Sequence, residues 1–229
     1  MFTLDPIYLL ISIPAVLLTF GAQLFVRYYY SKYSKIINYN RLNGLETVEK
    51  IAREHDINIK VNISLNDLSD NYNPINGTLT LSEKVARTPT VSSVGIAAHE
   101  MGHVLQHKNG FILIVIRNII TPIVNIGSTL GYFLFIVGLP LQLFNMVILG
   151  IILFSLSTLF TIITLPIEID ASVKALRILR SLNIVNEKEV GGVKKVLTAA
   201  ALTYLAAVMQ SLSSLLYYIL RAFNVKKKD

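Results

Sequence analysis

The chain has 229 residues, of which 53% are hydrophobic and only 15% are charged, and its formal net charge is +7. Soluble domains carry about a quarter charged residues, so this composition indicates a protein with much of its surface in lipid. The lack of cysteine excludes disulfides, zinc–thiolate clusters and thiol catalysis. Without a basic stripe interleaved with aromatic residues, the positive charge does not predict nucleic-acid binding.

The first predicted element is an uncharged run over residues 7–26. Twenty apolar residues are enough to cross a bilayer as a helix. Only Asp5 is charged before the run, whereas a cleaved signal peptide has a basic start and a small-residue cleavage site. We therefore predict a retained membrane span.

Residues 38–112 read as a soluble segment. A short helix is predicted at 44–55, and alternating patterns predict strands at 61–65 and 78–82. Between the strands, the Asn76-Gly77 pair predicts a turn, because both residues tolerate positive φ. We expect a small sheet in which strand 78–82 lies at an edge and pairs with an extended substrate peptide.

The next predicted helix, capped by Ser92 or Ser93, carries the sequence His99-Glu100-Met101-Gly102-His103. Histidines four residues apart lie on one face of a helix, so both rings can bind one Zn²⁺. Glu100 lies beside them and is suited to accept a proton from water at the metal. This spacing predicts a catalytic zinc site.

A catalytic zinc site normally has a third protein ligand. The metzincin spacing would require a histidine at Asn109, so that class is excluded. After Arg117 no charged residue appears until Glu168, and this stretch accommodates two spans at 119–137 and 142–165. Such a hairpin returns the chain to the same membrane face, which makes Glu168 the best candidate for the third ligand.

Three further residues are candidates for supporting roles. Ser172 lies one turn after Glu168 on the same helix face, whereas Asp170 points roughly away on an ideal helix. His107 continues the histidine stripe and could hydrogen-bond a reacting oxyanion or a group that holds a ligand. A solvated surface histidine is the alternative for His107.

A fourth span is predicted at 197–220, with a second soluble segment at 168–195. Eleven Lys or Arg residues lie within 27–117 and six within 168–195, which favours the cytoplasm for both segments and for the active site. A fourth crossing would export the tail RAFNVKKKD, which has four basic residues. The sequence leaves open whether the last helix fully crosses.

Six blocks resemble the YugP-type neutral zinc metallopeptidases of bacterial membranes: DPIYLL, LSDNYNP, LTLSEKV, AAHEMGHVLQH, LPIEIDAS and LTAAALTYLAA. The resemblance implies a gluzincin-like site, with His99, His103 and Glu168 as zinc ligands and Glu100 as the base. More distantly the chain is similar to HtpX and CAAX-type membrane proteases. Those enzymes place an aspartate four residues after the third ligand, where this chain has Ser172.

We therefore expect one domain over 1–229, a mainly α membrane protein of about four spans with a small α+β zincin-like catalytic portion. The expected function is that of a zinc metalloendopeptidase with one Zn²⁺ per chain. The protein is expected to lie in a lipid bilayer and to act on extended or unfolded polypeptides. The alternative is a non-catalytic membrane scaffold with a structural metal site. A transporter is disfavoured, because the spans contain almost no ionisable residues.

Overall fold

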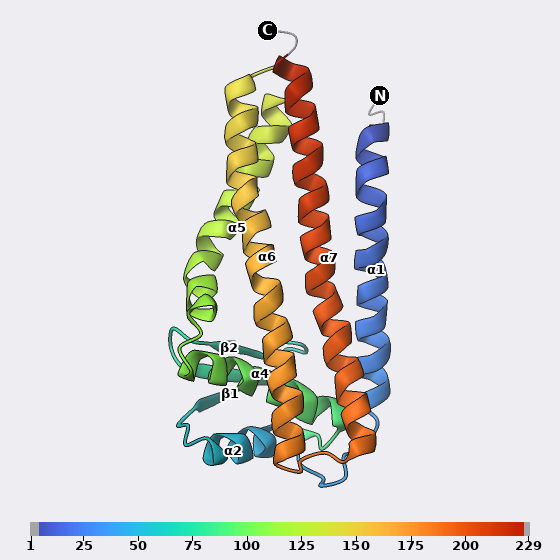
Figure 1. Ribbon diagram of the computed structural model, residues 1–229, viewed down its shortest axis with the longest axis vertical. Helices are drawn as coiled ribbons and strands as arrows, with labels where there is room; N and C mark the ends of the chain where they lie inside the picture. Colours follow the sequence, from blue (N-terminus) through green and yellow to red (C-terminus); the bar gives the residue numbers. More distant parts are fainter. Residues whose placement is uncertain (1–4, 227–229) are drawn as a thin grey trace. The chain divides into compact units, whose positions relative to one another are not determined.

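The structure is a computed structural model that describes residues 5–226. Within that range, four helices are long and apolar enough to cross a membrane, and they match the number of spans expected from the sequence. Figure 1 follows them along the chain: α1 (Pro6–Tyr33), α5 (Ile112–Gly138), α6 (Phe144–Ser181) and α7 (Glu187–Lys226). Each helix exceeds the roughly 20 residues that a bilayer requires.

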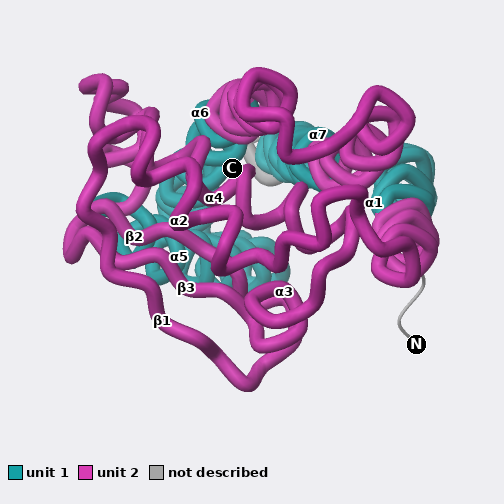
Figure 2. The backbone as a smooth tube through the Cα atoms, turned by 90° about the horizontal axis from the view of Figure 1, so that it is seen from below, with its two compact units in different colours: residues 1–22, 119–165, 203–229 teal, residues 23–118, 166–202 magenta. Residues whose placement is uncertain are grey.

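The chain divides into two compact units, which are distinguished by colour in Figure 2. Unit 1 comprises residues 1–22, 119–165 and 203–229, and it contains most of the apolar helical sequence. Unit 2 comprises residues 23–118 and 166–202, with the sheet and the histidine-bearing helix. The two units are considered separately below.

Unit 1 is held together by small and aromatic residues. The backbones of α5 and α6 touch where Gly131 and Gly150 meet, since a Cβ on either glycine would lie within 2.8 Å of the other's carbonyl oxygen. Such close approach is typical of small residues at helix interfaces in membranes. Nearby, the buried ring of Phe135 stacks on Tyr218 of α7 with centroids 4.0 Å apart.

The last helix runs back to the level of the N-terminus. Arg221 near the end of α7 forms an ion pair with Asp5, which directly precedes α1, and the Tyr217 hydroxyl donates to the same carboxylate over 2.9 Å. Within unit 1, α1 and α7 are therefore antiparallel, and the start of one meets the end of the other. The length and antiparallel course of α7 are those expected of a helix that crosses the membrane fully. Residues 227–229 of the tail lie outside the described range.

The sheet of unit 2 has the order β1-β3-β2, with β1 (Lys60–Ser64), β2 (Asn71–Asn73) and β3 (Thr78–Ser82). β1 pairs with β3 in parallel, and β2 pairs with β3 antiparallel. The predicted turn joins β2 to β3, where Gly77 has a φ of 64°. The expectation that strand 78–82 lies at an edge is wrong, because the short β2 occupies one side of it and β1 the other.

Two shorter helices support the sheet. α2 (Gly44–Glu54) begins with a capping box between Asn43 and Glu46, in which each side chain accepts from the other's backbone N–H. α4 (Val91–Lys108) begins two or three residues earlier than a cap at Ser92 or Ser93 would place it, since Thr90 is its N-cap. A five-residue helix, α3 (Glu83–Arg87), links β3 to α4.

Almost the whole of α4 is buried in unit 2. Its apolar residues pack against α2, α3 and the sheet, and the fully buried ones are Val94, Ala97, Ala98 and Met101. Because α4 is covered on nearly all sides, its polar residues must find partners inside the protein. The buried ones include Glu100 and His103, which the sequence predicts to be catalytic and metal-binding, and also Gln106.

Candidate metal centre

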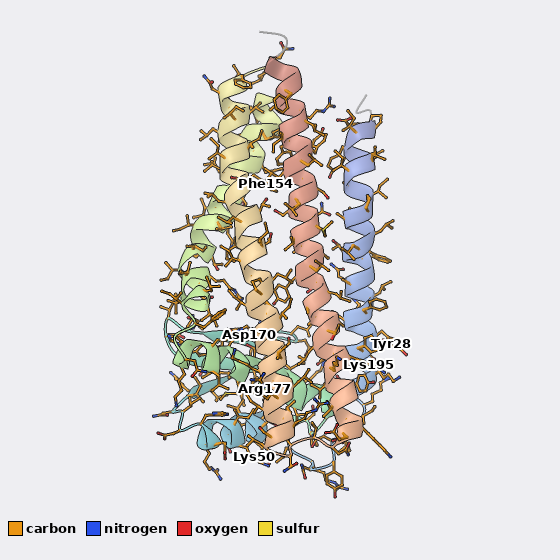
Figure 3. The ribbon with its side chains drawn as sticks, in the orientation of Figure 1. Tyr28, Lys50, Phe154, Asp170, Arg177 and Lys195 are labelled. Atoms are coloured by element: carbon orange, nitrogen blue, oxygen red, sulfur yellow. The ribbon has the colours of Figure 1, made fainter. Side chains whose placement is uncertain are left out.

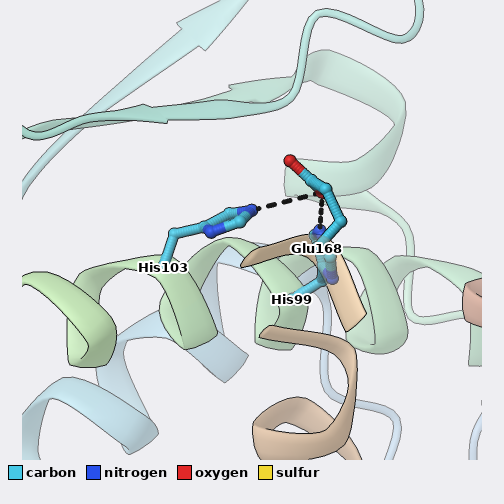
Figure 4. Close-up of side chains that lie close together, drawn as sticks. All are labelled: His99, His103 and Glu168. Atoms are coloured by element: carbon cyan, nitrogen blue, oxygen red, sulfur yellow. Dashed lines mark hydrogen bonds and ion pairs between the residues drawn. The ribbon is translucent and has the colours of Figure 1, made fainter. Parts of the chain in front are cut away.

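The two histidines lie where helical spacing places them. His99 and His103 are one turn apart on α4, and their rings meet edge to face with centroids 4.8 Å apart. His103 is buried and His99 is partly exposed. Their Nε2 atoms both face the carboxylate of Glu168, as Figure 4 shows.

Glu168 comes from α6, two residues after Pro166, and it is buried to 1% exposure. Its Oε2 lies 3.2 Å from His99 Nε2 and 3.6 Å from His103 Nε2. Ligand atoms of a tetrahedral zinc with bonds of about 2.0–2.1 Å are about 3.3–3.4 Å apart. The three side chains thus have the spacing and the nitrogen and oxygen donors that a zinc ion needs.

The other nitrogen of His103 is held by Gln106, a residue that the sequence reasoning missed. Both amide hydrogens of Gln106 are engaged, one by the Ile167 carbonyl oxygen and one by Asp170 Oδ2, each at 2.8 Å. Its Oε1 therefore accepts from His103 Nδ1, 2.9 Å away. With the proton on Nδ1, the Nε2 lone pair of His103 is free to bind a metal.

The ring of His99 is also held by a hydrogen bond, but a longer one. Its Nδ1 lies 3.2 Å from the hydroxyl of Ser172, one turn after Glu168 on α6. This contact agrees with the expectation that Ser172 lies on the same face of the helix as Glu168. Asp170 was expected to point away from the site; it does not touch the histidines, but it is linked to His103 through Gln106 and also pairs with Lys174. Asp170 is labelled on α6 in Figure 3.

Glu100 lies between the two histidines in the sequence and is buried in α4. Burial raises the pKa of its carboxyl to about 7, and the negative charge of Glu168 adds to this rise. A carboxyl with such a pKa can take up and release a proton near neutral pH.

Arg117 is the second residue that sequence reasoning missed. It lies on the first turns of α5, and its Nη1 donates to Glu168 Oε1 over 2.6 Å. The sequence did carry a signal, because Arg117 and Glu168 are the two charges that flank the long uncharged stretch. A hairpin brings its two ends together, so an ion pair between opposite charges at those ends was predictable.

His107, a candidate for a supporting role, forms a hydrogen bond with Tyr72. Its Nδ1 is 2.7 Å from the hydroxyl of Tyr72 on β2, and the two rings lie 5.9 Å apart. This contact ties the C-terminal end of α4 to the strand beside it.

Three side chains that could hold a metal ion, in a chain whose described part has four helices long and apolar enough to cross a membrane, are typical of membrane metalloproteins. The family model described as "Putative neutral zinc metallopeptidase" matches residues 8–223. The chain therefore belongs to the neutral zinc metallopeptidase family. A curated protein of Bacillus subtilis (strain 168), "Putative membrane protease YugP", is 38% identical over 227 residues, which cover 97% of this chain and 100% of the relative. No solved structure matches the chain significantly.

Proposed function

We propose that this protein is a membrane-embedded zinc metalloendopeptidase with His99, His103 and Glu168 as ligands and Glu100 as the general base. The observation that carries the proposal is the convergence of Glu168 Oε2 on both histidine Nε2 atoms, at 3.2 and 3.6 Å. Family membership supports the same activity at the level of a zinc metallopeptidase.

Each residue has a defined part in this reaction. His99, His103 and Glu168 would hold the zinc ion, which would supply a Lewis acid for a water molecule and for the peptide carbonyl. Glu100 accepts the proton of the attacking water and passes it to the nitrogen of the leaving amine. A dication held by His99, His103 and Glu168 would favour the ionised form of Glu100, which is the form that can act as a base. Gln106 and Ser172 hold the histidine rings so that Nε2 of each is directed at the metal.

We also propose that the substrate binds in an extended form. Of the two edge strands, β2 is the one tied to α4, through Tyr72 and His107. An extended peptide that pairs with β2 would gain main-chain hydrogen bonds without a requirement for a particular sequence. Unfolded polypeptides should then be cleaved faster than the same chains when folded.

The test compares purified wild type with Glu100→Gln and His99→Ala on an unfolded reporter, with the zinc content measured for each. We expect Glu100→Gln to keep about one zinc per chain and to lower kcat by about 100- to 10,000-fold, the usual contribution of a general base. His99→Ala should lose both zinc and activity. A Glu100→Gln protein that cleaves at the wild-type rate would refute the proposed role of Glu100. Equal zinc content in His99→Ala would refute the ligand set.

A further inference from the structure

The two oxygens of Glu168 have different partners. Oε2 faces the histidine nitrogens, whereas Oε1 accepts a hydrogen bond from Arg117 Nη1 at 2.6 Å. The side chain of Glu168 is 2% exposed and that of Arg117 is 25% exposed. A buried charge pair of this kind has a strong, directional hydrogen bond, because little water competes for it.

The different partners of the two Glu168 oxygens affect how many coordination positions of a bound metal stay open. Two imidazole nitrogens and one carboxylate oxygen leave one position of a tetrahedral zinc open, as catalytic sites require. A carboxylate can also bind through both oxygens, and the second oxygen would then occupy space that water or substrate needs. The orientation of Oε1 therefore bears directly on whether the site is open.

We propose that Arg117 is a positioning residue that holds Glu168 Oε1 away from the metal, so that Glu168 binds through Oε2 alone. The inference rests on the metal site proposed above, and it does not depend on the peptidase reaction. Arg117 lies on α5, whereas the proposed ligands lie on α4 and α6. The coordination position left for water or substrate is therefore kept open by a third helix.

The charge of Arg117 makes the proposal distinguishable from a purely structural role. A cation close to the ligands repels a bound dication, so that removing it strengthens metal binding. Removing it also frees Oε1 to make a second bond to the metal. An arginine that merely maintained the fold would instead lower metal affinity and stability when removed.

The test measures cobalt(II)-substituted protein, because the intensity of the cobalt d–d bands decreases as coordination rises from four to five. The variants are Arg117→Gln, Arg117→Lys and, as a matched control, Arg87→Gln, which removes an exposed arginine paired with Glu83. Metal affinity is measured by competition with a chelator, and the unfolding temperature is recorded for each protein.

In Arg117→Gln we expect weaker cobalt bands, metal affinity at least equal to wild type, and kcat lowered about 10- to 100-fold, the range found when residues that orient metal ligands are removed. Arg117→Lys keeps the positive charge but replaces the planar guanidinium with a single ammonium group, which holds Glu168 Oε1 less firmly. Its band intensity should therefore lie between those of Arg117→Gln and wild type. Arg87→Gln should match wild type.

Wild-type band intensity in both Arg117 variants would overturn the proposal, and so would a tenfold or greater loss of metal affinity. If Arg117→Gln does not fold, the Lys variant decides on the same spectrum: intermediate intensity supports the proposal and wild-type intensity overturns it. Because the spectrum needs no turnover, a protein that binds metal but cleaves no peptide would refute the proposed function and leave this test intact.

Discussion

Gln106 connects the two chain segments that form the metal site, and it does so through a single amide. Its oxygen accepts from His103, while its nitrogen donates to Asp170 and to the Ile167 carbonyl oxygen. The histidine spacing was readable in the sequence, because helix geometry alone places residues four apart on one face. The role of Gln106 was not, because its amide nitrogen donates to Ile167 and Asp170, 61 and 64 residues further along the chain, although His103 is only three residues away.

Replacing Gln106 with leucine should weaken the metal site without changing its ligands. The apolar side chain cannot accept from His103 Nδ1, so the tautomer that exposes Nε2 is no longer favoured. We expect a 10- to 100-fold loss of zinc affinity or activity. Leaving the buried partners of the amide unsatisfied should also lower the free energy of unfolding by about 1–3 kcal/mol. Chelator competition and thermal unfolding measure the two effects.

Two comparisons sharpen this test. Gln23→Leu, at an exposed position of α1, should leave zinc affinity unchanged. Ser172→Ala should cost less than Gln106→Leu, because the Ser172 contact with His99 is longer, at 3.2 against 2.9 Å. A serine variant with the larger loss would contradict the ranking of the two contacts.

The site depends on how closely α4 and α6 approach each other. A Cβ built on Gly102 would lie 2.6 Å from the carbonyl oxygen of Ala171, so only glycine fits between His99 and His103 at this crossing. Ala171 is three residues after Glu168 on α6, so this contact brings Glu168 close to the two histidines of α4. The close packing of the two helices, and not the histidine spacing, therefore brings the third ligand to the other two.

Gly102→Ala should separate α4 from α6 and disrupt the metal site. The added methyl group meets backbone atoms, which cannot move aside as a flexible side chain can, and overpacking of this kind costs about 1–3 kcal/mol. We expect a lower unfolding temperature and a loss of bound zinc. The control is Gly191→Ala on α7 of the same unit, where nothing lies within 4 Å of an added Cβ. That variant should be neutral or stabilising, because alanine favours helix. Normal zinc content in Gly102→Ala would contradict the inferred role of the crossing.

At the scale of the whole molecule, four helices alternate with polar segments, and the ion pair of Asp5 with Arg221 fixes the direction of the last helix. Most cations lie in residues 27–117 and 168–195. The positive-inside rule therefore favours the cytoplasm for these segments, although a full crossing of α7 would place Arg221 on the other side. We propose that the active site faces the cytoplasm.

Cysteine labelling tests this orientation, because the natural chain has no cysteine to interfere. Glu54→Cys at the exposed end of α2 and Phe223→Cys near the end of α7 are treated in intact cells with a membrane-impermeant maleimide. We expect labelling at position 223 and protection at position 54 until the cells are lysed. The opposite pattern would place the active site outside, and equal labelling at both positions would contradict the fourth crossing.

The sequence by itself determined the local features of this protein: the four apolar spans, the histidine pair with Glu100, and the turn at Asn76-Gly77. These follow from helix period, span length and turn chemistry, which depend on residues close together in the chain. Glu168 was also within reach, because a charge-free hairpin must return the chain to one membrane face.

The tertiary structure alone decided which strand lies at the edge of the sheet and which residues support the ligands. β3 is central because β2 pairs with one side of it and β1 with the other. Gln106 and Arg117 become parts of the site only when α4, α5 and α6 pack together. The contacts of Gln106 with α6 depend on hydrogen bonding between distant segments, which no local pattern in the sequence encodes. For Arg117 the sequence carried only the two charges that flank the uncharged stretch, and the packing decided which atoms meet.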